Sequence, residues 1–277
     1  MIKILADSSA DYPVDMKVSC LVTTLPLMIN FGGETYRDKV DLTADDFYEK
    51  IKTSSVMPKT AQVSENDYKE AMIKMLDSND DEIIVITLAG ALSGTYNSAV
   101  KAADAVDKKR IHVIDGSVTM LNCVLVVKAV ELIEAGKNTK QVIKEIKDTI
   151  RNQHAVFSVY DLDFLKRGGR ISFVQSVVGG MLNIKPILTL TNERGLTSID
   201  KAKGDKQLIK KLIKYAKEGR NKKNPLMLVY AGKDILPKAL AFQKELEEAL
   251  GEKVEFFTEV GAVIGTHTGP GLLGVGY

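Results

Sequence analysis

A serine stands in a short loop of small residues, directly after an apolar, β-branched run that is typical of a buried strand. Residues 89–98 read AGALSGTYNS and follow EIIVITL at residues 82–88. A loop between a strand and a helix start presents backbone N–H groups and the Ser93 hydroxyl, which together favour an anion. The alternative is structural, because a serine that caps a helix stabilises it by about 1 kcal/mol. This loop alone favours the structural role.

The spacing around Ser93 excludes three catalytic or nucleotide-binding motifs. A phosphate-binding P-loop counted from Gly90 needs a second glycine where Thr95 stands, followed by a lysine that is absent here. A hydrolase nucleophile elbow needs glycine where Ala91 and Thr95 flank the serine. No G-x-G-x-x-G follows an expected strand, so the dinucleotide fingerprint is also missing.

The histidines, cysteines and acidic residues do not form a metal-binding pattern. His112 and His154 fall in or beside expected strands, and no cluster has the spacing of metal ligands. The acidic segment DSSAD at residues 7–11 favours a turn in which Asp accepts hydrogen bonds from its own backbone. Cys20 and Cys123 lie in apolar sequence, and we expect two buried free thiols. The sequence therefore predicts no metal and no cofactor.

Three further segments carry polar groups in expected loops. Thr60 lies in MPKTAQVS, between two expected helices, where nothing structural demands a hydroxyl. Arg167 and Arg170 flank a pair of glycines in LKRGGRIS, and His267 and Thr268 lie in the Gly-rich GTHTGPG near the C-terminus. The run KKLIKYAKEGRNKKN is a solvated helix face or, alternatively, a docking surface for an acidic partner.

The elements that must position these groups change character along the chain. Strands alternate with helices up to about residue 153, which predicts a parallel sheet with helices on its faces. Residues 186–204 then alternate apolar and polar around Gly195, which predicts a hairpin, and the Gly-rich residues 261–277 predict no regular helix. We expect an α/β fold of two domains, residues 1–153 with a parallel sheet and residues 154–277 of α+β type.

Composition narrows the function classes. Of 277 residues, 45% are hydrophobic, which suffices for a substantial core. Residues 151–277 carry 20 basic and 13 acidic side chains, but the chain has no Trp and no stripe of aromatic and basic residues, which disfavours nucleic acid. No window has the length of a membrane span, and MIKILADSS turns polar too soon for a signal peptide. We expect a cytoplasmic protein.

Taken together, these segments resemble the DegV family of bacterial fatty-acid-binding proteins. The resemblance runs along nearly the whole chain. It rests on five pieces in order: ADSSAD near the start, Thr60 in its Pro-containing loop, LSGTYNSA, RGGRIS and the late GTHTGPG. Each piece is weak alone, whereas five in this order are specific. One departure concerns the threonine loop, which reads MPKTAQVS where Ser-Gln-Pro commonly follows the Thr.

The resemblance implies a two-domain α/β fold with a lipid tunnel between the domains. It implies that one long-chain fatty acid is bound, with its carboxylate held by the hydroxyls of Thr60 and Ser93 and with His267 near the head group. Some members carry the acyl chain for a fatty acid kinase, which phosphorylates the bound carboxylate, and Arg170 matches the Arg associated with that step. By this resemblance the chain is a binding subunit and not itself an enzyme, with transient membrane contact.

The physical case agrees with a lipid ligand. About 14 buried methylenes gain roughly 11 kcal/mol, against an association cost of about 4–15 kcal/mol, so the tail sets affinity and the head group sets orientation. We expect the apolar wall of the tunnel to include residues of FVQSVVGGMLNIKPIL, LPLMINF and GAVIG. Two alternatives stay open: an acyl- or phosphoryl-transfer enzyme with Ser93 as nucleophile and His267 as base, and a nucleotide-binding module.

Overall fold

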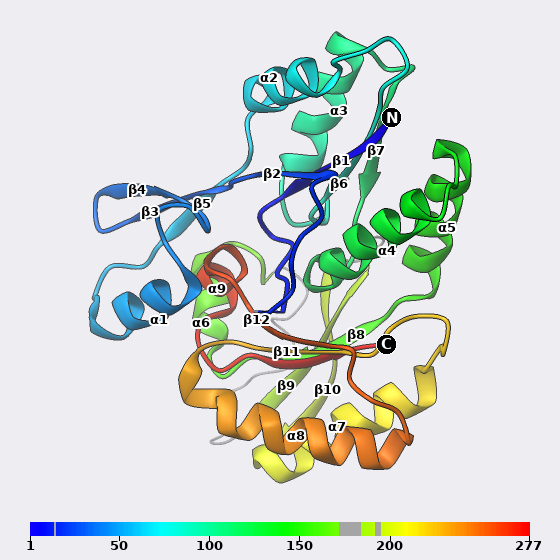
Figure 1. The fold of residues 1–277 in the computed structure, drawn as a ribbon. Helices are drawn as coiled ribbons and strands as arrows, with labels where there is room; N and C mark the ends of the chain where they lie inside the picture. Colours follow the sequence, from blue (N-terminus) through cyan, green and yellow to red (C-terminus); the bar gives the residue numbers. More distant parts are fainter. Residues whose placement is uncertain (14, 172–183, 192–194) are drawn as a thin grey trace.

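The computed structural model describes residues 1–13, 15–171, 184–191 and 195–277 (Figure 1). These residues form a parallel sheet, a small antiparallel sheet and a larger mixed sheet, with helices packed around them. None of the helices in these ranges is apolar over enough residues to cross a bilayer.

The parallel sheet is built where the sequence predicts it. Its strand order is β2-β1-β6-β7, and every neighbouring pair is parallel. The strands are β1 (Ile2–Asp7), β2 (Val22–Leu25), β6 (Glu82–Thr87) and β7 (Ile111–Asp115). Side chains of residues 83–86 are almost wholly buried, as a strand covered on both faces requires. The flanking helices are α2 (Glu65–Met75), α3 (Thr95–Val106), α4 (Asn122–Glu134) and α5 (Thr139–Asn152). The pair α2 and α3 lies on one face and the pair α4 and α5 on the other (Figure 1).

Two helix starts are marked by capping hydrogen bonds. Thr43 precedes α1 (Ala44–Thr53), and its hydroxyl accepts from the backbone N–H of Asp46. Ser64 precedes α2 and forms a reciprocal capping box with Asp67. Such caps satisfy amide donors that the first helical turn leaves unpaired, which is why these starts are legible in sequence.

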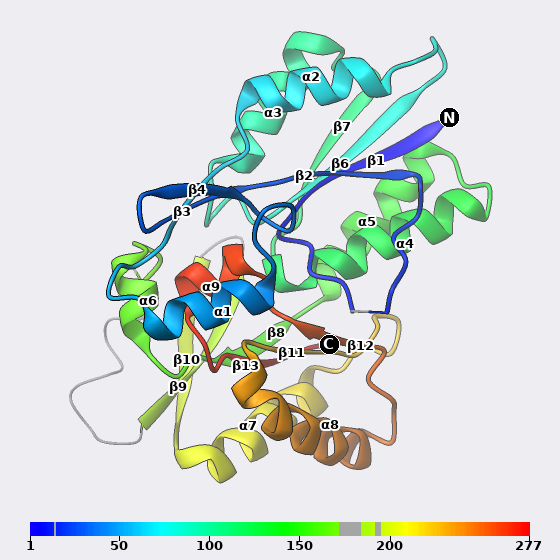
Figure 2. The ribbon, with the colours of Figure 1, turned by 60° about the vertical axis from the view of Figure 1, so that its left-hand side comes forward.

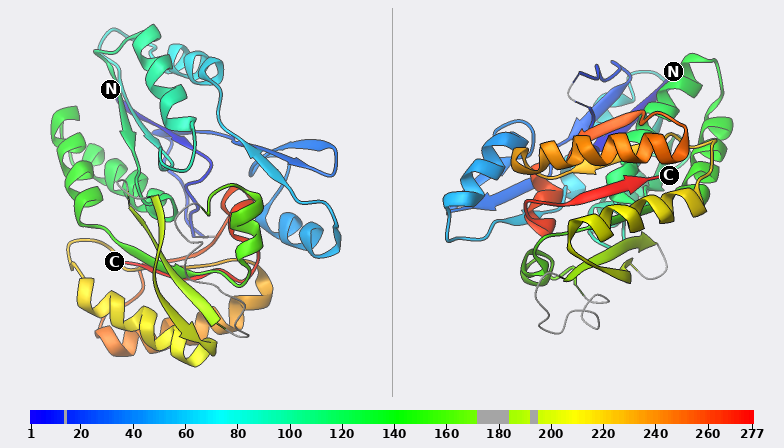
Figure 3. Two further views of the ribbon diagram at one scale, coloured as in Figure 1. Left: turned by 180° about the vertical axis from the view of Figure 1, so that it is seen from behind. Right: turned by 90° about the horizontal axis from the view of Figure 1, so that it is seen from below.

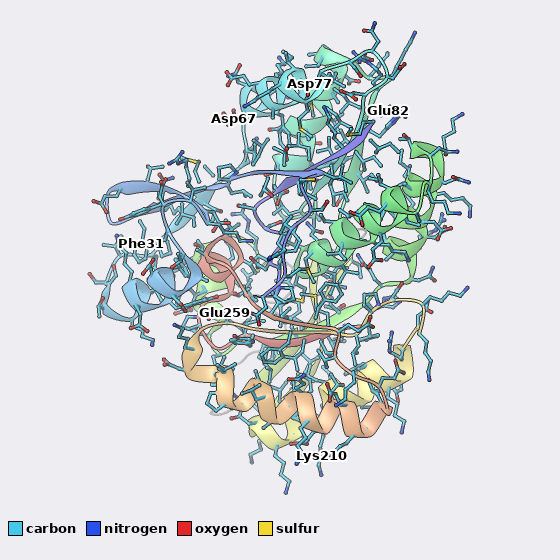
Figure 4. All side chains as sticks on the ribbon, in the orientation of Figure 1. Phe31, Asp67, Asp77, Glu82, Lys210 and Glu259 are labelled. Atoms are coloured by element: carbon cyan, nitrogen blue, oxygen red, sulfur yellow. The ribbon has the colours of Figure 1, made fainter. Side chains whose placement is uncertain are left out.

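A three-stranded antiparallel sheet projects from the parallel sheet and carries Thr60. Its order is β4-β3-β5, with β3 (Met28–Phe31), β4 (Glu34–Arg37) and β5 (Lys59–Ala61). Thr60 therefore lies in a strand, paired with Ile29, and the expected loop is wrong. Phe31 of β3, which is labelled in Figure 4, packs edge-on against Phe47 of α1, with ring centroids 6.1 Å apart. Tertiary packing against α1 decides this sheet, which no local pattern signals.

The mixed sheet contains the predicted hairpin and runs in the order β10-β9-β8-β13-β11-β12. Its strands are β8 (Ala155–Ser158), β9 (Ile184–Thr191), β10 (Gly195–Lys203), β11 (Met227–Tyr230), β12 (Phe256–Glu259) and β13 (Leu273–Gly276). The hairpin of β9 and β10 is antiparallel, as predicted. Helices α7 (Gly204–Gly219) and α8 (Leu236–Leu250) lie side by side under the sheet (Figure 3). Lys210 on α7 is exposed and points away from the sheet (Figure 4).

The Gly-rich C-terminal segment corrects the sequence analysis, because it contains helix α9 (Ala262–Thr268) as well as β13. Helix α1 packs closely against α9 at Gly265. A Cβ there would lie 2.6 Å from the Tyr48 hydroxyl and 2.9 Å from the Phe47 ring, so the close contact needs a glycine. Figure 2 shows α9 against α1. Close approach of two helices, which glycine permits, outweighs its low helix propensity.

Two hydrophobic cores support the fold. The larger one includes Ile84 and Val85 of the parallel sheet and extends to Leu188 and Val229 of the mixed sheet. The second lies between the mixed sheet and helices α7 and α8.

Cys123 is buried in the larger core as expected, but Cys20 is exposed in the loop after β1, because that loop runs over the surface. The expectation of two buried thiols is wrong for Cys20. Short helical segments α6 (Leu162–Arg167), η1 (Thr119–Leu121) and η2 (Lys233–Ile235) complete the described elements.

Candidate functional site

An apolar cavity lies where elements of the three sheets meet, with about 720 Å³ of empty space that includes its opening to solvent. Most of the side chains that line it are apolar: Leu27, Leu88, Leu92, Val118, Met120, Phe157, Leu165, Leu190, Leu196, Val263 and Ile264. The polar lining is Thr60, Ser93, Thr119, Arg170, His267 and Thr268. The cavity thus gathers all four predicted site residues from segments far apart in sequence.

Ser93 is held at the cavity by the loop between β6 and α3. Its backbone N–H donates to the Ala89 carbonyl over 3.2 Å, and its hydroxyl lies 3.0 Å from the Thr95 hydroxyl. The Thr95 amide also donates to the Ser93 hydroxyl over 3.3 Å. The N-cap of α3 is Gly94, whose Cβ would lie 2.0 Å from the Gln62 side chain, so a larger residue there requires Gln62 to move. Ser93 therefore stands one residue before the cap and faces the cavity.

Thr60 and His267 meet across the molecule. The Thr60 hydroxyl lies 2.8 Å from His267 Nε2, although 207 residues separate them in sequence. Nδ1 of the same ring is buried and has no hydrogen-bond partner among the described residues. Gly168 packs onto the ring so closely that a Cβ there would lie 2.3 Å from Nδ1. Burial, and then the charge of Arg170, lower the pKa of His267 from 6.5 to about 4. The imidazole is therefore neutral at pH 7.

Arg170 contributes a cation that no carboxylate within the described ranges neutralises. Its Nε donates to the Leu92 carbonyl over 3.1 Å and its Nη1 to the Gly168 carbonyl over 2.6 Å. No ion pair of Arg170 forms with the acidic side chains of those ranges. Arg167, the other basic residue of LKRGGRIS, is exposed at the end of α6 and does not line the cavity. The guanidinium at position 170 thus leaves positive charge at the polar part of the cavity.

Sequence reasoning identified part of the apolar wall. LPLMINF contributes Leu27, and GAVIG contributes Val263 and Ile264. From the expected wall FVQSVVGGMLNIKPIL, residues 173–183 lie outside the described residues. The sequence did not identify Val118 and Met120 as part of the wall. No local signal marks them, because their place at the cavity depends on packing between segments that are distant in sequence.

The segment ADSSAD has the structural role that its sequence predicts. Asp7 is buried and accepts from the amide of Ser9 over 3.0 Å and from the amide of Leu88 over 2.7 Å. It therefore joins the ends of β1 and β6 and helps to shape the loop that carries Ser93. Burial raises its pKa. Among the described residues, no group of three or more His, Cys, Asp or Glu side chains is arranged to hold a metal ion.

Comparison with known proteins decides the family. The model of the DegV family, described as an uncharacterised protein family, matches residues 1–277. The chain belongs to the DegV family. A DegV domain-containing protein of Caldanaerobacter subterraneus is 38% identical over 282 residues, which cover 99% of this chain and 97% of that protein. The family resemblance in the sequence is thereby confirmed.

Solved DegV structures share the fold. A DegV family protein from Thermus thermophilus, described as binding fatty acid, has a TM-score of 0.89 and 32% identity, and covers 99% of this chain and 98% of that one. A stearic acid-binding protein from Eubacterium ventriosum has the same TM-score of 0.89 with 28% identity, covering 100% of this chain and 97% of that one. The expected α/β DegV architecture is confirmed, and these structural neighbours bind fatty acids.

Proposed function

We propose that this DegV protein binds one long-chain fatty acid, with the alkyl chain in the apolar cavity and the carboxylate at Thr60, Ser93 and His267. The observation that carries the proposal is the 2.8 Å contact between Thr60 and His267, in a mostly apolar cavity that Ser93 also lines. A carboxylate buried without donors would cancel much of the gain from burying the chain. The hydroxyls of Thr60 and Ser93 provide hydrogen-bond donors for the carboxylate in a lining that is mostly apolar.

The tautomer of His267 follows from this role. A Thr60 hydroxyl that donates to a carboxylate needs its own acceptor lone pair satisfied, and His267 Nε2–H is the group in reach. The neutral ring then carries its proton on Nε2, which leaves the buried Nδ1 without a proton and avoids an orphaned N–H donor. Without a ligand, the low pKa of His267 keeps the ring neutral at pH 7, as this arrangement requires.

The enzyme alternative has weaker geometric support. The described contacts of the Ser93 hydroxyl are with Thr95, and the hydroxyl next to His267 is that of Thr60. A Ser-His pair needs the base within hydrogen-bond reach of the nucleophile and a third group that orients the base. His267 Nδ1 has no such group among the described residues. We therefore keep the binding function as the proposal.

Native mass spectrometry of protein purified without added lipid tests the binding function. We expect one co-purified fatty acid per chain, or stoichiometric uptake of palmitate by protein that has been stripped of lipid. The matched ligand is hexadecanol, which keeps the alkyl chain and removes the carboxylate. A protein that carries no co-purified fatty acid and takes up none that is added would contradict the proposal. Equal affinity for palmitate and hexadecanol would contradict the head-group assignment.

We further propose that the bound acid is presented to a separate fatty acid kinase, so that this chain is a binding subunit. In that step a carboxylate oxygen attacks the γ-phosphorus of ATP, the bond to ADP breaks, and an acyl phosphate forms. Arg170 supports the proposal because its cation faces the cavity without a carboxylate partner among the described residues. Arginine in such a position stabilises the charge of a transferring phosphoryl group.

Arg170→Gln separates presentation from binding. With ATP and a fatty acid kinase, acyl phosphate is trapped by hydroxylamine as a hydroxamate and counted against bound palmitate. We expect the variant to lose at least tenfold in hydroxamate formation while it binds palmitate within threefold of the parent protein, where tenfold corresponds to about 1.4 kcal/mol. Arg167→Gln is the matched control, since Arg167 is exposed and outside the cavity. Equal loss in both variants would contradict a specific role.

The domain boundary, the cellular location and the contact with a membrane are also proposals. We place a domain boundary at residue 153, since the described strands of the first two sheets end before residue 116 and those of the mixed sheet begin after residue 154. A cytoplasmic location and transient contact with a membrane fit a lipid carrier. Limited proteolysis tests the boundary, because two stable fragments that meet near residue 153 are expected if the two parts are separate domains.

A further inference from the structure

Helix α9 carries four of the residues that line the cavity, and its position therefore decides the shape of the polar end. Val263, Ile264, His267 and Thr268 all belong to it. The helix has seven residues, so its own backbone hydrogen bonds hold it weakly. Contacts from outside must hold it in place, and the contact between Thr60 and His267 lies near its C-terminal end.

The N-terminal end of α9 is held by side chains from the first part of the chain. The backbone N–H of Gly261, the N-cap residue, donates to Asp11 Oδ2 over 2.9 Å. One residue earlier, the Tyr48 hydroxyl donates to the Val260 carbonyl over 2.9 Å. The fit is tight, because a Cβ at Gly261 would lie 2.5 Å from Asp11 Oδ1. Asp11 is 7% exposed, so water does not substitute for it.

Lys39 holds the other oxygen of the same carboxylate. Its Nζ lies 2.7 Å from Asp11 Oδ1 and donates to the Ala10 carbonyl over 2.8 Å. Lys39 has a positive φ of 63°, a conformation that costs energy for a residue with a side chain and needs support from its surroundings. One oxygen of the Asp11 carboxylate thus pairs with the Lys39 ammonium, and the other accepts a hydrogen bond from the Gly261 amide at the start of α9. Neither Asp11 nor Lys39 lines the cavity.

We propose that Asp11, held by Lys39, is a positioning residue that fixes α9 and through it the imidazole of His267 against Thr60. Without the carboxylate, the Gly261 amide and the Lys39 ammonium both lose their buried partner, and α9 is free to shift. A shift of α9 separates His267 from Thr60 and moves Val263 and Ile264, whereas the other apolar side chains of the wall lie outside α9 and keep their places. This assigns to the second acid of ADSSAD a role in head-group recognition at a distance.

The first test reads the position of His267 without any ligand. In Asp11→Ala, we expect the pKa of His267, followed by NMR of the imidazole, to rise by at least one unit from about 4 toward 6.5, because the ring loses its burial. Asp11→Asn keeps an oxygen for the Gly261 amide and is expected to shift the pKa less, and it serves if the Ala variant fails to fold. An unchanged His267 pKa in both variants would overturn the proposal.

The second test reads head-group recognition and rests on the proposed function. The ratio of palmitate to hexadecanol affinity is expected to fall about tenfold in Asp11→Ala, with hexadecanol affinity within threefold of the parent protein; tenfold is about 1.4 kcal/mol. Should the parent protein show no preference for palmitate, the proposed function fails, whereas the imidazole titration still decides the role of Asp11. An unchanged ratio in a protein that does prefer palmitate would count against positioning.

A matched variant separates positioning from a general loss of stability. Glu252→Gln breaks the ion pair between Arg220 and Glu252, whose side chains are 7% and 20% exposed and whose closest atoms are 2.8 Å apart. That pair lies away from α9, between the end of α7 and the end of α8. We expect Glu252→Gln to lower the melting temperature and to leave the His267 pKa and the palmitate ratio unchanged. The same shifts in this variant would overturn the role of Asp11.

Discussion

At the scale of single residues, the candidate site is defined by groups that are polar but uncharged at neutral pH. Thr60 and Ser93 supply hydroxyls, and burial keeps His267 neutral by lowering its pKa to about 4. The one cation that lines the cavity among the described residues is Arg170. Hydrogen bonds to a charged ligand contribute roughly 1.5–3 kcal/mol each, so each hydroxyl should leave a measurable mark on carboxylate affinity.

Thr60→Val and Ser93→Ala test this assignment. Each variant removes one hydroxyl and keeps nearly the same shape, so we expect palmitate affinity to fall about tenfold to a hundredfold, which is about 1.4 to 2.7 kcal/mol. Hexadecanol affinity should change less, because no carboxylate is stranded. Isothermal titration calorimetry on lipid-free protein measures both constants.

Thr268→Val is the matched control for the hydroxyl variants. The Thr268 hydroxyl lines the cavity but already donates to the Ile264 carbonyl over 3.1 Å within its own helix. We expect its loss to leave the palmitate to hexadecanol ratio within threefold of the parent value. A ratio that is equally reduced in all three variants, or in none, would contradict a specific role for Thr60 and Ser93.

At the scale of elements, α9 is the decisive piece of structure, because it brings a late histidine to an early threonine. It packs against α1 through Gly265 and is held at its start by Asp11 and Tyr48. A helix of seven residues with a central glycine has little intrinsic stability. Its formation therefore depends on the elements that it contacts. A larger side chain at its contact with α1 should displace it.

Gly265→Ala tests the close approach of α9 and α1. In an unconstrained helix this change stabilises by roughly 1 kcal/mol, because alanine has the higher helix propensity. Here the new methyl group would lie 2.6 Å from the Tyr48 hydroxyl, so we expect a loss of about 1–3 kcal/mol from overpacking. Urea unfolding followed by circular dichroism measures the free energy of unfolding.

Tyr48→Phe supplies the control for Gly265→Ala. The double variant removes the hydroxyl that the new methyl group meets first, so the two changes together should cost less than the sum of the single changes. Strict additivity, or a stabilising Gly265→Ala, would show that α9 does not lie in contact with α1 as described.

At the scale of the whole molecule, a cluster of buried carboxylates lies at the junction of the parallel sheet, the small antiparallel sheet and α9. Asp38 follows β4, is 1% exposed, and both its oxygens lack hydrogen-bond partners among the described residues. Burial raises its pKa from 3.8 to about 7, while the Lys39 charge lowers it and the charges of Asp11 and Asp7 add repulsion. The stability of the fold must therefore depend on pH through this residue.

Asp38→Asn tests this dependence. Since the folded pKa lies above the unfolded one, folding takes up a proton between about pH 4 and pH 7, and the stability that Asp38 contributes is lost as pH rises through about 7. The variant should therefore match the parent protein near pH 4. Above pH 8 we expect it to be more stable by on the order of a few kcal/mol. Chemical unfolding across this pH range gives the difference.

Asp41→Asn is the matched control for Asp38→Asn. Asp41 is exposed, and its hydrogen bonds from Arg37 lower its pKa to about 2. Its removal should cost stability at neutral pH, and that cost should vanish as pH falls through about 2, which is the opposite sign. A stability difference for Asp38→Asn that does not change between pH 4 and pH 8 would show that the Asp38 pKa is not raised.

The sequence by itself determined several of the regular elements and the family. Local patterns identify β1, β6, the capped helix starts at Thr43 and Ser64, and the hairpin around Gly195, because each depends on interactions within a few residues. The same holds for the candidate groups Thr60, Ser93, Arg170 and His267, which motif context singles out. These features can be read before any contact between distant segments is known.

Only the tertiary structure decided what those groups do to one another. Thr60 lies in a strand because β3 pairs with it, and α9 is a helix because α1 accepts Gly265 at close range. Contacts over 207 residues bring Thr60 to His267, and burial there sets the imidazole pKa. Pairing between distant segments and desolvation depend on the whole packed chain, and local periodicity carries no information about either.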